Sequence, residues 1–341
     1  MKKTSLLLLP ILLTVILFNS CSTNVDLYAD YKDITVVYGL LDSNADTNFV
    51  KINKAFLGPG NALDIALIAD SCNYPYKLDA KIIEYRAPAS GTNFQRTDTY
   101  PLDTVTVHNK ELGTFYAPDQ LVYYTKQKIK SNSNQYKYRY ELQIDRGDSI
   151  INAITDIVGG SSFSILTGTL NLTSSNNNGI IKWYPCPNAS VYEVVLRFHF
   201  TEVNQYNDST ERIMTWPLGS HPEASLTMEH GYYTVTFKAS QFTVNLATML
   251  GADTLNHNVE RLIYEPSMEI SVSAGGDELY NFITVNGPSS SIVQTIPEYT
   301  NVNGGFGVFS SRTALSKRVK LAGNTIPELT GHENWHFKQV K

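Results

Sequence analysis

The sequence predicts a mainly β protein of two β-sandwich-like domains, with a few short helices in the second half. Three observations lead to this fold class. The chain has 341 residues, enough for two domains, and it holds 21 Tyr and 14 Phe with only 17% charged residues. Several segments alternate apolar and polar residues with a period of two, and turn signals separate them at intervals of roughly 8–12 residues.

The first domain is predicted over residues 33–158. Residues 34–41 form an almost continuous apolar run that ends at a turn signal, and 49–56 and 77–86 alternate, so each predicts a strand. The clearest alternation is at 136–145, where one face is apolar: Tyr136, Tyr138, Tyr140, Leu142 and Ile144. A turn at 146–148 and a returning strand at 149–158 follow. Residues 61–70 predict a short helix with its apolar residues on one side.

The second domain is predicted over residues 162–341, after the Gly-Gly-Ser-Ser run that starts at Gly159. Further strands are predicted at 164–172, 180–184, 190–203, 211–216, 232–237 and 268–273. In 190–203 the set formed by Tyr192, Val194, Leu196, Phe198 and Phe200 is wholly apolar and is expected to face the core. Helices are predicted at 240–250, between a Ser240 cap and a Gly251 stop, and at 277–285, capped by Asp277. Residues 301–310 are a Gly-rich strand or loop, and 315–341 are ambiguous.

Residues 1–20 have the organisation of a secretory signal peptide. Lys2 and Lys3 form a basic start, residues 6–17 are almost wholly apolar, and small residues close the segment. The apolar run is too short for a membrane-spanning helix, which needs about 20 residues, and Pro10 interrupts it. No other stretch approaches that length, so no second span is expected.

The end of this segment, Leu17-Phe18-Asn19-Ser20-Cys21, resembles the lipobox of bacterial lipoproteins. The resemblance implies cleavage before Cys21, a diacylglycerol on its thiol and an acyl chain on the new amine. Ser22 rather than Asp after the cysteine favours the outer membrane in the enteric sorting pattern. Residues 21–32 then form a polar tether. The alternative is an ordinary signal peptide with a chance cysteine.

The remaining cysteines, Cys72 and Cys186, are far apart in sequence and have no metal-binding spacing. An oxidising compartment would permit a disulfide between them, but two unpaired buried thiols in separate domains are the favoured interpretation.

Three places in the body resemble known families. Tyr140-x-Leu142 followed by Ala153-x-Thr155 resembles the last two strands of an immunoglobulin-like or fibronectin-type sandwich, and Trp183 with Ala189 and Tyr192 resembles a second such pair. The segment from Glu298 to Phe309 resembles the closing motif of Bacteroidetes-type outer-membrane lipoproteins. That family is a domain of unknown function with an N-terminal immunoglobulin-like sandwich. It implies compartment and architecture, with no activity and no site residue to transfer.

Two motifs suggest chemistry but lack its context. His332-Glu333-Asn334-Trp335-His336 matches the H-E-x-x-H zinc-protease pattern, which needs both histidines on one helical face. No long amphipathic helix precedes it and no downstream ligand follows, so a chance match is favoured. Gly304-Gly305-Phe306-Gly307 could cradle a phosphate, but Ser310 stands where the dinucleotide fingerprint needs a small Gly or Ala. Glycines that permit a bulge or a close strand crossing are favoured.

Other candidates are unspecific. His108, His199, His221, His230 and His257 are scattered, and His199 is expected on the surface. Trp216, Trp335 and the tyrosines could form a sugar-stacking platform, although aromatic residues in sandwiches more often form cores or cross-strand pairs. There is no G-x-S-x-G elbow.

These observations predict a lipid-anchored cell-envelope protein, with Cys21 as the lipid attachment site and with no catalytic, cofactor or metal residue assigned. A binding or assembly role at the outer membrane is expected, with an outer-membrane protein or a glycan as partner. The net charge of −5 argues against nucleic acid. The alternative is a secreted-type hydrolase that acts on glycans or peptides. A binding module predicts an aromatic groove without convergent titratable groups, an enzyme predicts a pocket where such groups converge, and an accessory protein predicts a broad apolar face.

Overall fold

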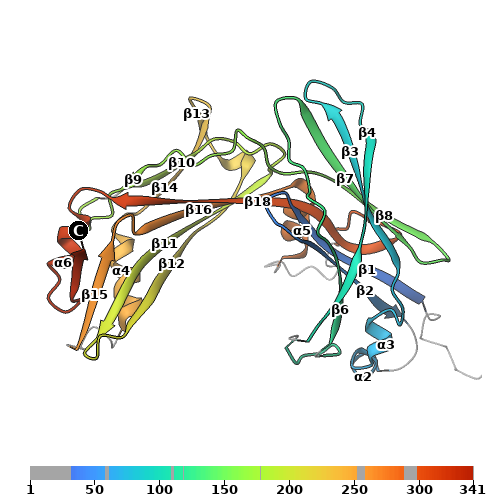
Figure 1. Cartoon of the computed structure of the whole chain (residues 1–341), viewed down its shortest axis with the longest axis horizontal. Coiled ribbons are helices and arrows are strands. Elements are labelled where there is room, and N and C mark those ends of the chain that lie inside the picture. The colour runs from blue at the N-terminus through green and yellow to red at the C-terminus, as the bar shows by residue number, and fades with distance from the viewer. Residues whose placement is uncertain are drawn as a thin grey trace, which may run out of the picture.

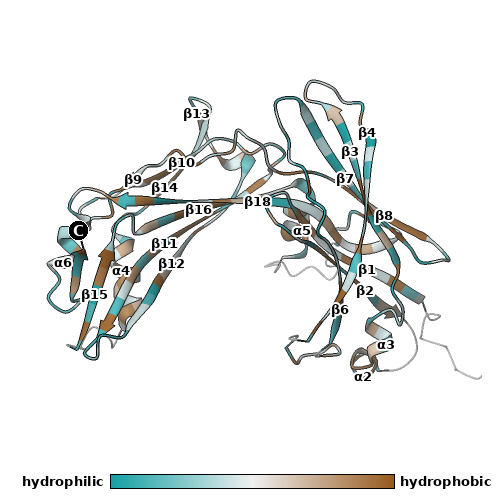
Figure 2. Cartoon of the chain, in the orientation of Figure 1, coloured by the Kyte–Doolittle hydropathy of each residue, from teal (hydrophilic) through white to brown (hydrophobic). Residues whose placement is uncertain are grey.

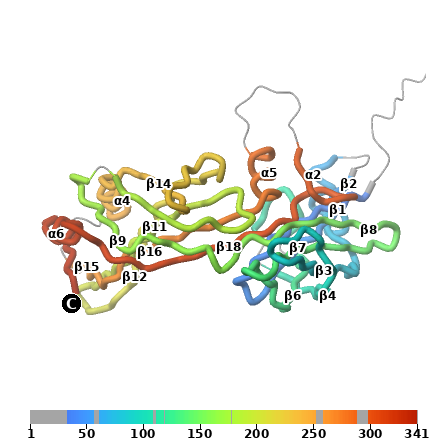
Figure 3. Tube along the Cα trace, turned by 90° about the horizontal axis from the view of Figure 1, so that it is seen from above, coloured from blue at the N-terminus to red at the C-terminus, as the bar shows by residue number. Residues whose placement is uncertain are grey.

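The chain is mainly β, as predicted, and consists of two sandwiches that stand side by side and form an arch (Figure 1). A computed structural model describes residues 32–57, 61–108, 111–117, 119–176, 178–251, 258–287 and 298–340. The predicted signal peptide, Cys21 and residues 21–31 of the predicted tether lie outside these ranges. Seen from above, the two sandwiches lie along one axis, and strand β18 (Gly305–Leu321) runs from one into the other (Figure 3).

The first sandwich packs two layers of strands. One layer is a five-stranded sheet in the order β17-β8-β7-β3-β4. The other contains β1, β2, β6, β5 and the first part of β18. The bounds are β1 (Lys32–Asp42), β2 (Asn48–Leu57), β3 (Asp79–Pro88), β4 (Gln95–Pro101), β5 (Asp103–Val107), β6 (Gln120–Thr125), β7 (Tyr136–Asp145), β8 (Ile150–Asp156) and β17 (Val302–Asn303).

The second sandwich covers the other end of the same long sheet with a smaller layer. β10, β14 and β13 form that layer together with helix α4, and β19, β15, β11, β16 and β18 lie opposite, with β12 paired to β11. The bounds are β9 (Thr169–Leu170), β10 (Gly179–Trp183), β11 (Val191–Asn204), β12 (Ser209–Pro222), η1 (Glu223–Ser225), β13 (Met228–Glu229), β14 (Tyr232–Phe237), α4 (Gln241–Leu250), β15 (Val259–Tyr264), β16 (Met268–Gly275), α6 (Thr325–Thr330) and β19 (Phe337–Val340).

The period-two patterns place their apolar faces in the cores. In β7 the alternate residues Tyr138, Tyr140, Leu142 and Ile144 are at most 8% exposed. In β11 the predicted core set is buried throughout, at 0–2% exposed. Figure 2 shows brown and teal segments following one another along the strands of the second sandwich, as expected where one face of a sheet is buried.

Strand β18 belongs to both sandwiches, which the predicted boundary at 159–161 did not anticipate. Its first part pairs in parallel with β1, and its second part pairs antiparallel with β16. Arg312 is the turning point, because it lies opposite Asp42 on one side and Gly275 on the other. Val302 and Phe309 lie in the first core, although the prediction assigned them to the second domain.

Several predicted elements differ in detail. Residues 61–70 form two short helices, α2 (Ala62–Ala66) and α3 (Ala69–Cys72), and the predicted strand at 164–172 is only β9. Helix α5 (Asp277–Asn286) is capped by Gly276 rather than by Asp277, whose side chain turns to Ser190 instead. Ser240 makes no side-chain cap for α4, whereas Gly251 ends that helix as predicted. No helix among the described residues is long and apolar enough to cross a membrane.

Candidate functional site

Helix α5 stands at the junction of the two sandwiches, and two hollows lie against it. It starts directly after β16, at the close-packed pair Gly275–Gly276, where a Cβ on Gly275 would come within 2.9 Å of Leu279. An acidic cleft opens at its first turn and an apolar groove runs along its length.

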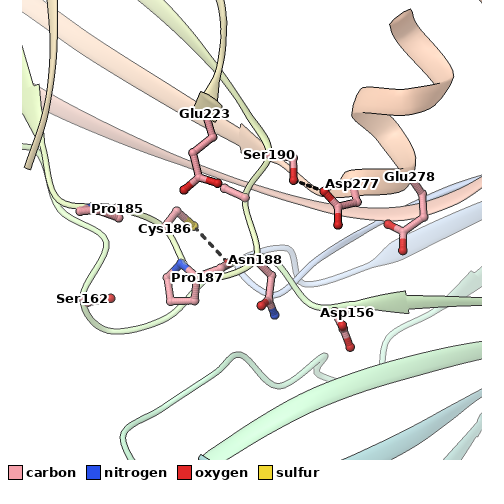
Figure 4. A pocket seen from close by; sticks show the side chains of 11 residues that line it. Asp156, Ser162, Pro185, Cys186, Pro187, Asn188, Ser190, Glu223, Asp277 and Glu278 are labelled. Carbon is pink, nitrogen blue, oxygen red and sulfur yellow. Dashed lines mark hydrogen bonds between the residues drawn. The ribbon is translucent and has the colours of Figure 1, made fainter. Parts of the chain in front are cut away.

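The acidic cleft has a volume of about 550 Å³ and brings carboxylates together from three elements. Asp156 comes from the end of β8, Glu223 from η1, and Asp277 and Glu278 from the start of α5. Figure 4 shows Ser190 facing Asp277, with Glu278 beside it. These positions are remote in sequence, and only the topology of β16 and β18 makes them neighbours.

Three of these carboxylates are held by neighbouring side chains. Asp156 accepts two hydrogen bonds from the Arg139 guanidinium, at 2.7 and 3.0 Å. Glu223 accepts one from the Tyr233 hydroxyl at 2.7 Å, and Asp277 accepts the hydroxyl of Ser190.

Glu278 joins the two sandwiches. Its Oε2 atom accepts hydrogen bonds from the hydroxyls of Thr155 on β8 and Ser310 on β18, each at 3.0 Å. Burial raises the pKa of this carboxyl, while the hydrogen bonds it accepts act in the opposite direction. Every carboxylate of the cleft therefore has a donor within the protein, and no histidine is among the residues that line it. This arrangement fastens the junction more than it prepares a catalytic group.

The apolar groove, about 500 Å³ in volume, lies between α5 and the outer face of β1 and β2. Tyr38 of β1 meets Phe282 of α5 edge to face, with ring centroids 6.1 Å apart. Phe49 of β2 lines the groove further along, and its ring centroid lies 6.2 Å from that of Tyr124. Asp42 and Arg312 supply the charged groups of its lining, so the groove is aromatic and aliphatic along most of its length.

Two of the aromatic rings that line this groove are about half exposed to solvent. Tyr38 is 46% exposed and Phe49 is 51% exposed, while their strand neighbours Val37 and Val50 are fully buried. Because side chains alternate between the faces of a strand, Tyr38 lies on the outer face of the sheet, where polar residues are usual. The groove therefore exposes aromatic and aliphatic side chains on a face of the sheet that is usually polar.

Both described cysteines are free and buried, in agreement with the favoured interpretation. The Cys72 thiol donates to the Ala66 carbonyl at 3.1 Å. Burial raises the pKa of Cys186 to about 12, so this thiol is protonated at neutral pH although it lies beside the acidic cleft.

The H-E-x-x-H segment does not form a helical metal site. Residues 333–335 form a turn, and His336 adopts a left-handed backbone with φ of 52°. The His332 ring stacks on Trp335 with centroids 3.9 Å apart. No group of three metal-ligating side chains occurs among the described residues.

The Gly-rich segment is a close strand crossing, as favoured. A Cβ on Gly305 would lie 2.6 Å from the Thr35 carbonyl oxygen. At Gly307, where φ is +106°, it would lie only 2.0 Å from the Val37 carbonyl oxygen. These glycines let β18 lie directly against β1.

One expectation about a surface residue is wrong. The His199 side chain is only 10% exposed, because it lies among Glu211, Glu269 and Arg318. Trp216 and Trp335 are 8% and 5% exposed and belong to the second core, which agrees with the interpretation favoured over a sugar-stacking platform. His257 lies outside the described residues.

The sequence analysis missed both hollows. The acidic cleft had no local motif, because its carboxylates come from three elements that are far apart in the sequence. The groove left one weak signal, since the run at 34–41 is apolar on both faces, which a strand with a fully solvated outer face does not need.

Comparison with known proteins adds little. No protein-family model matches the chain, and no curated protein matches it. Among solved structures, the crystal structure of CBD12 from CALX1.2 is similar at 7% identity, over 84% of this chain and 99% of that chain, with a TM-score of 0.16. A TM-score this low does not establish a shared fold.

Proposed function

We propose that this chain is a lipid-anchored binding or accessory component of the cell envelope, tethered through Cys21 at the outer membrane. The resemblance of residues 17–21 to a lipobox supports the anchor. Two or more acyl chains hold a protein stably at a bilayer, since each buried CH₂ contributes about 0.8 kcal/mol.

The single observation that carries the binding role is the aromatic groove along α5. Solvent-facing Tyr38, Phe49 and Ile283 line one hollow, and Asp42 and Arg312 are the charged residues of its lining. Exposed rings that are arranged in a groove provide a surface for sugar rings or for apolar side chains of a partner. The acidic cleft is a weaker candidate, because its carboxylates already have protein donors.

The anchor is tested by metabolic labelling with a clickable palmitate and by fractionation. The wild-type chain is expected to incorporate the label and to sediment with membranes, and Cys21→Ser is expected to do neither. An unlabelled wild-type chain, or a variant that remains in the membrane fraction, would refute the anchor.

The binding role is tested by affinity capture of the lipidated protein from envelopes, followed by mass spectrometry of proteins and analysis of bound saccharides. A species captured by the wild type and lost with Tyr38→Ser/Phe282→Ser is the expected result. Ile180→Ser is the matched control, because Ile180 is 42% exposed on the other sandwich. Identical capture by all three chains would rule out the groove as the binding surface.

A hydrolase acting on glycans or peptides remains the second candidate, and one observation favours it. Glu278, a carboxyl whose pKa is raised by burial, lies next to Asp277 in the acidic cleft, and two carboxyl groups that share one cleft are the machinery of glycoside hydrolysis. Release of reducing ends from envelope polysaccharides that is abolished by Glu278→Gln would support it. No release by the wild type would exclude it for those substrates.

A further inference from the structure

One end of the first sandwich carries a group of apolar side chains that are exposed to solvent. They come from α2, from the residues that follow it, and from the loop before β6, and each is more than half exposed: Leu63, Leu67, Ile68, Leu112 and Phe115. We name this group the apolar tip. Leu112 is the most exposed of them, at 91%.

The tip is held in place from behind. Leu63 and Leu67 are four residues apart and therefore share one face of α2, while Ala66 is buried. The Ala66 carbonyl accepts the backbone N–H of Tyr116 at 2.8 Å, which holds the loop that carries Leu112 and Phe115 against the helix. It also accepts the Cys72 thiol. The exposed leucines are thus displayed on a supported scaffold.

The tip lies at the end of the sandwich where β1 begins. Lys32, the first residue of β1, is paired with Leu57, the last residue of β2. Leu63 follows six residues later, so the chain places it within about 22 Å of Leu57. The Thr35 hydroxyl also lies 2.6 Å from the Tyr74 hydroxyl, which ties the segment after α3 to β1. Figure 1 shows α2 and α3 together at the lower end of this sandwich, away from β13 and from the β3–β4 turn.

We infer that the apolar tip rests in the surface of the lipid bilayer that holds the acyl chains of Cys21. This inference rests on the proposed anchor. Ten residues lie between Cys21 and Lys32. Even when fully extended, a chain of that length reaches at most about 40 Å, so the anchor holds the tip near the membrane.

The chemistry of the tip selects the occupant. Leucine, isoleucine and phenylalanine side chains enter the boundary between headgroups and acyl chains. The charged residues that the structure describes in the same segments, Asp64, Asp70 and Glu111, are acidic, so they would not attract anionic headgroups. A zwitterionic leaflet is therefore the surface that fits.

The test uses the full lipidated chain, reconstituted into vesicles of phosphatidylcholine with brominated acyl chains, which quench tryptophan fluorescence at the depth of the bromines. Leu112→Trp reports on the tip. Met228→Trp is the matched control, since Met228 is 52% exposed on β13, on the opposite side of the arch (Figure 1). The native tryptophans are at most 8% exposed and give a constant background.

We expect brominated lipid to reduce the added emission of Leu112→Trp by about twofold or more and to leave that of Met228→Trp nearly unchanged. Adding Leu63→Asp/Leu67→Asp to the reporter should abolish its quenching, with near-ultraviolet circular dichroism as the check on folding. Equal quenching at both sites, or none at Leu112→Trp, would overturn the inference.

Palmitate labelling of the same samples separates the two proposals. A labelled chain without quenching refutes the membrane contact and leaves the anchor standing, whereas an unlabelled chain refutes the anchor itself. Protection of Leu112→Trp from acrylamide in whole envelopes, without quenching in pure lipid, would assign the tip to a protein partner and would also overturn the inference.

Discussion

Among the residues that the structure describes, each sandwich has one fully buried charged side chain, and the two have opposite charge. In the first, Glu84 is fully buried and accepts hydrogen bonds from the Tyr100 hydroxyl at 2.5 Å, the Thr97 hydroxyl at 2.7 Å and the Lys130 ammonium at 2.7 Å. Burial alone would raise the pKa of Glu84, but these donors outweigh it and hold the pKa below its usual range.

In the second sandwich the buried ion is Arg261. Its Nε atom donates to Glu202 at 2.9 Å and its guanidinium also donates to the Trp335 carbonyl at 3.0 Å. Glu202 is shared with Arg212, which donates to it at 2.7 Å. Arg261 is paired in the sheet with Phe337, whose ring contacts Phe198 and Phe200 in the second core.

In both sandwiches the buried charged side chain, Glu84 or Arg261, fastens an irregular segment to a sheet. Glu84 binds Lys130, whose backbone N–H also reaches the Tyr140 hydroxyl, and so holds the connection between β6 and β7. Arg261 holds the turn that contains the H-E-x-x-H letters, through the carbonyls of Trp335 and His336. A buried ion of this kind is strongly destabilising when one partner is removed, because the other charge is stranded.

The largest loss of stability is expected from a substitution in β18, the strand that both sandwiches share. Gly307→Ala forces a side chain into the Val37 carbonyl at a positive φ, and we expect a loss of at least about 4 kcal/mol in unfolding free energy. Gly147→Ala is the matched control. Its φ is +88° but nothing lies within 4 Å, so about 1 kcal/mol is expected in urea denaturation. Equal losses of unfolding free energy in Gly307→Ala and Gly147→Ala would contradict the close contact between Gly307 and the Val37 carbonyl.

The next effect tests the buried cation. Arg261→Met removes its bonds to Glu202 and Trp335, and we expect a loss of about 3–5 kcal/mol in unfolding free energy. Arg197→Met removes a partly exposed pair with Glu269 and should cost less than about 1 kcal/mol. If Arg261→Met costs no more than Arg197→Met, the ion does not fasten the C-terminal segment.

Neutralising Glu84 should cost less stability than removing Arg261, and the contribution of Glu84 to stability should depend on pH. Glu84→Gln keeps the shape, and the half-exposed Lys130 can turn to water, so about 2 kcal/mol is expected at pH 7. Because the folded pKa of Glu84 is lowered, its contribution is complete above its ordinary value of 4.5 and disappears as the pH falls through the folded pKa. Urea midpoints of both chains from pH 7 to pH 3 should therefore converge in acid; a constant gap would refute the charge pairing.

The smallest effect is expected at Glu278, whose ionised form lowers the stability of the fold, whereas ionised Glu84 raises it. The pKa of Glu278 is raised by burial, so its ionised form costs stability above the folded pKa, and that cost is relieved as the pH falls. Glu278→Gln should leave the free energy of unfolding at pH 7 unchanged or raise it by up to about 1 kcal/mol, and the thermal midpoint should follow. A clear loss of stability would mean that Thr155 and Ser310 require the carboxylate.

The sequence predicted the elements that bury one whole face, because burial enforces alternation. Strand β7 and strand β11 are the clearest cases. It missed β4, an edge strand in which Tyr100 alone is buried, so that its composition is that of a loop. The groove as a whole could not be predicted beyond the apolar run at 34–41, since Tyr38 meets Phe282 only in a fold where β18 pairs with β1 across more than 260 residues of chain. Cys21 could be proposed because its signal is local.

The shared strand also sets an order of events during synthesis. Residues 305–312 fill a place in the first sandwich beside β1, and Val302 and Phe309 complete its core. A ribosome delivers them only after nearly all of the second sandwich has been made. Until then β1 presents an unpaired edge, so the first strand of the sandwich to be made is among the last to be paired on both sides.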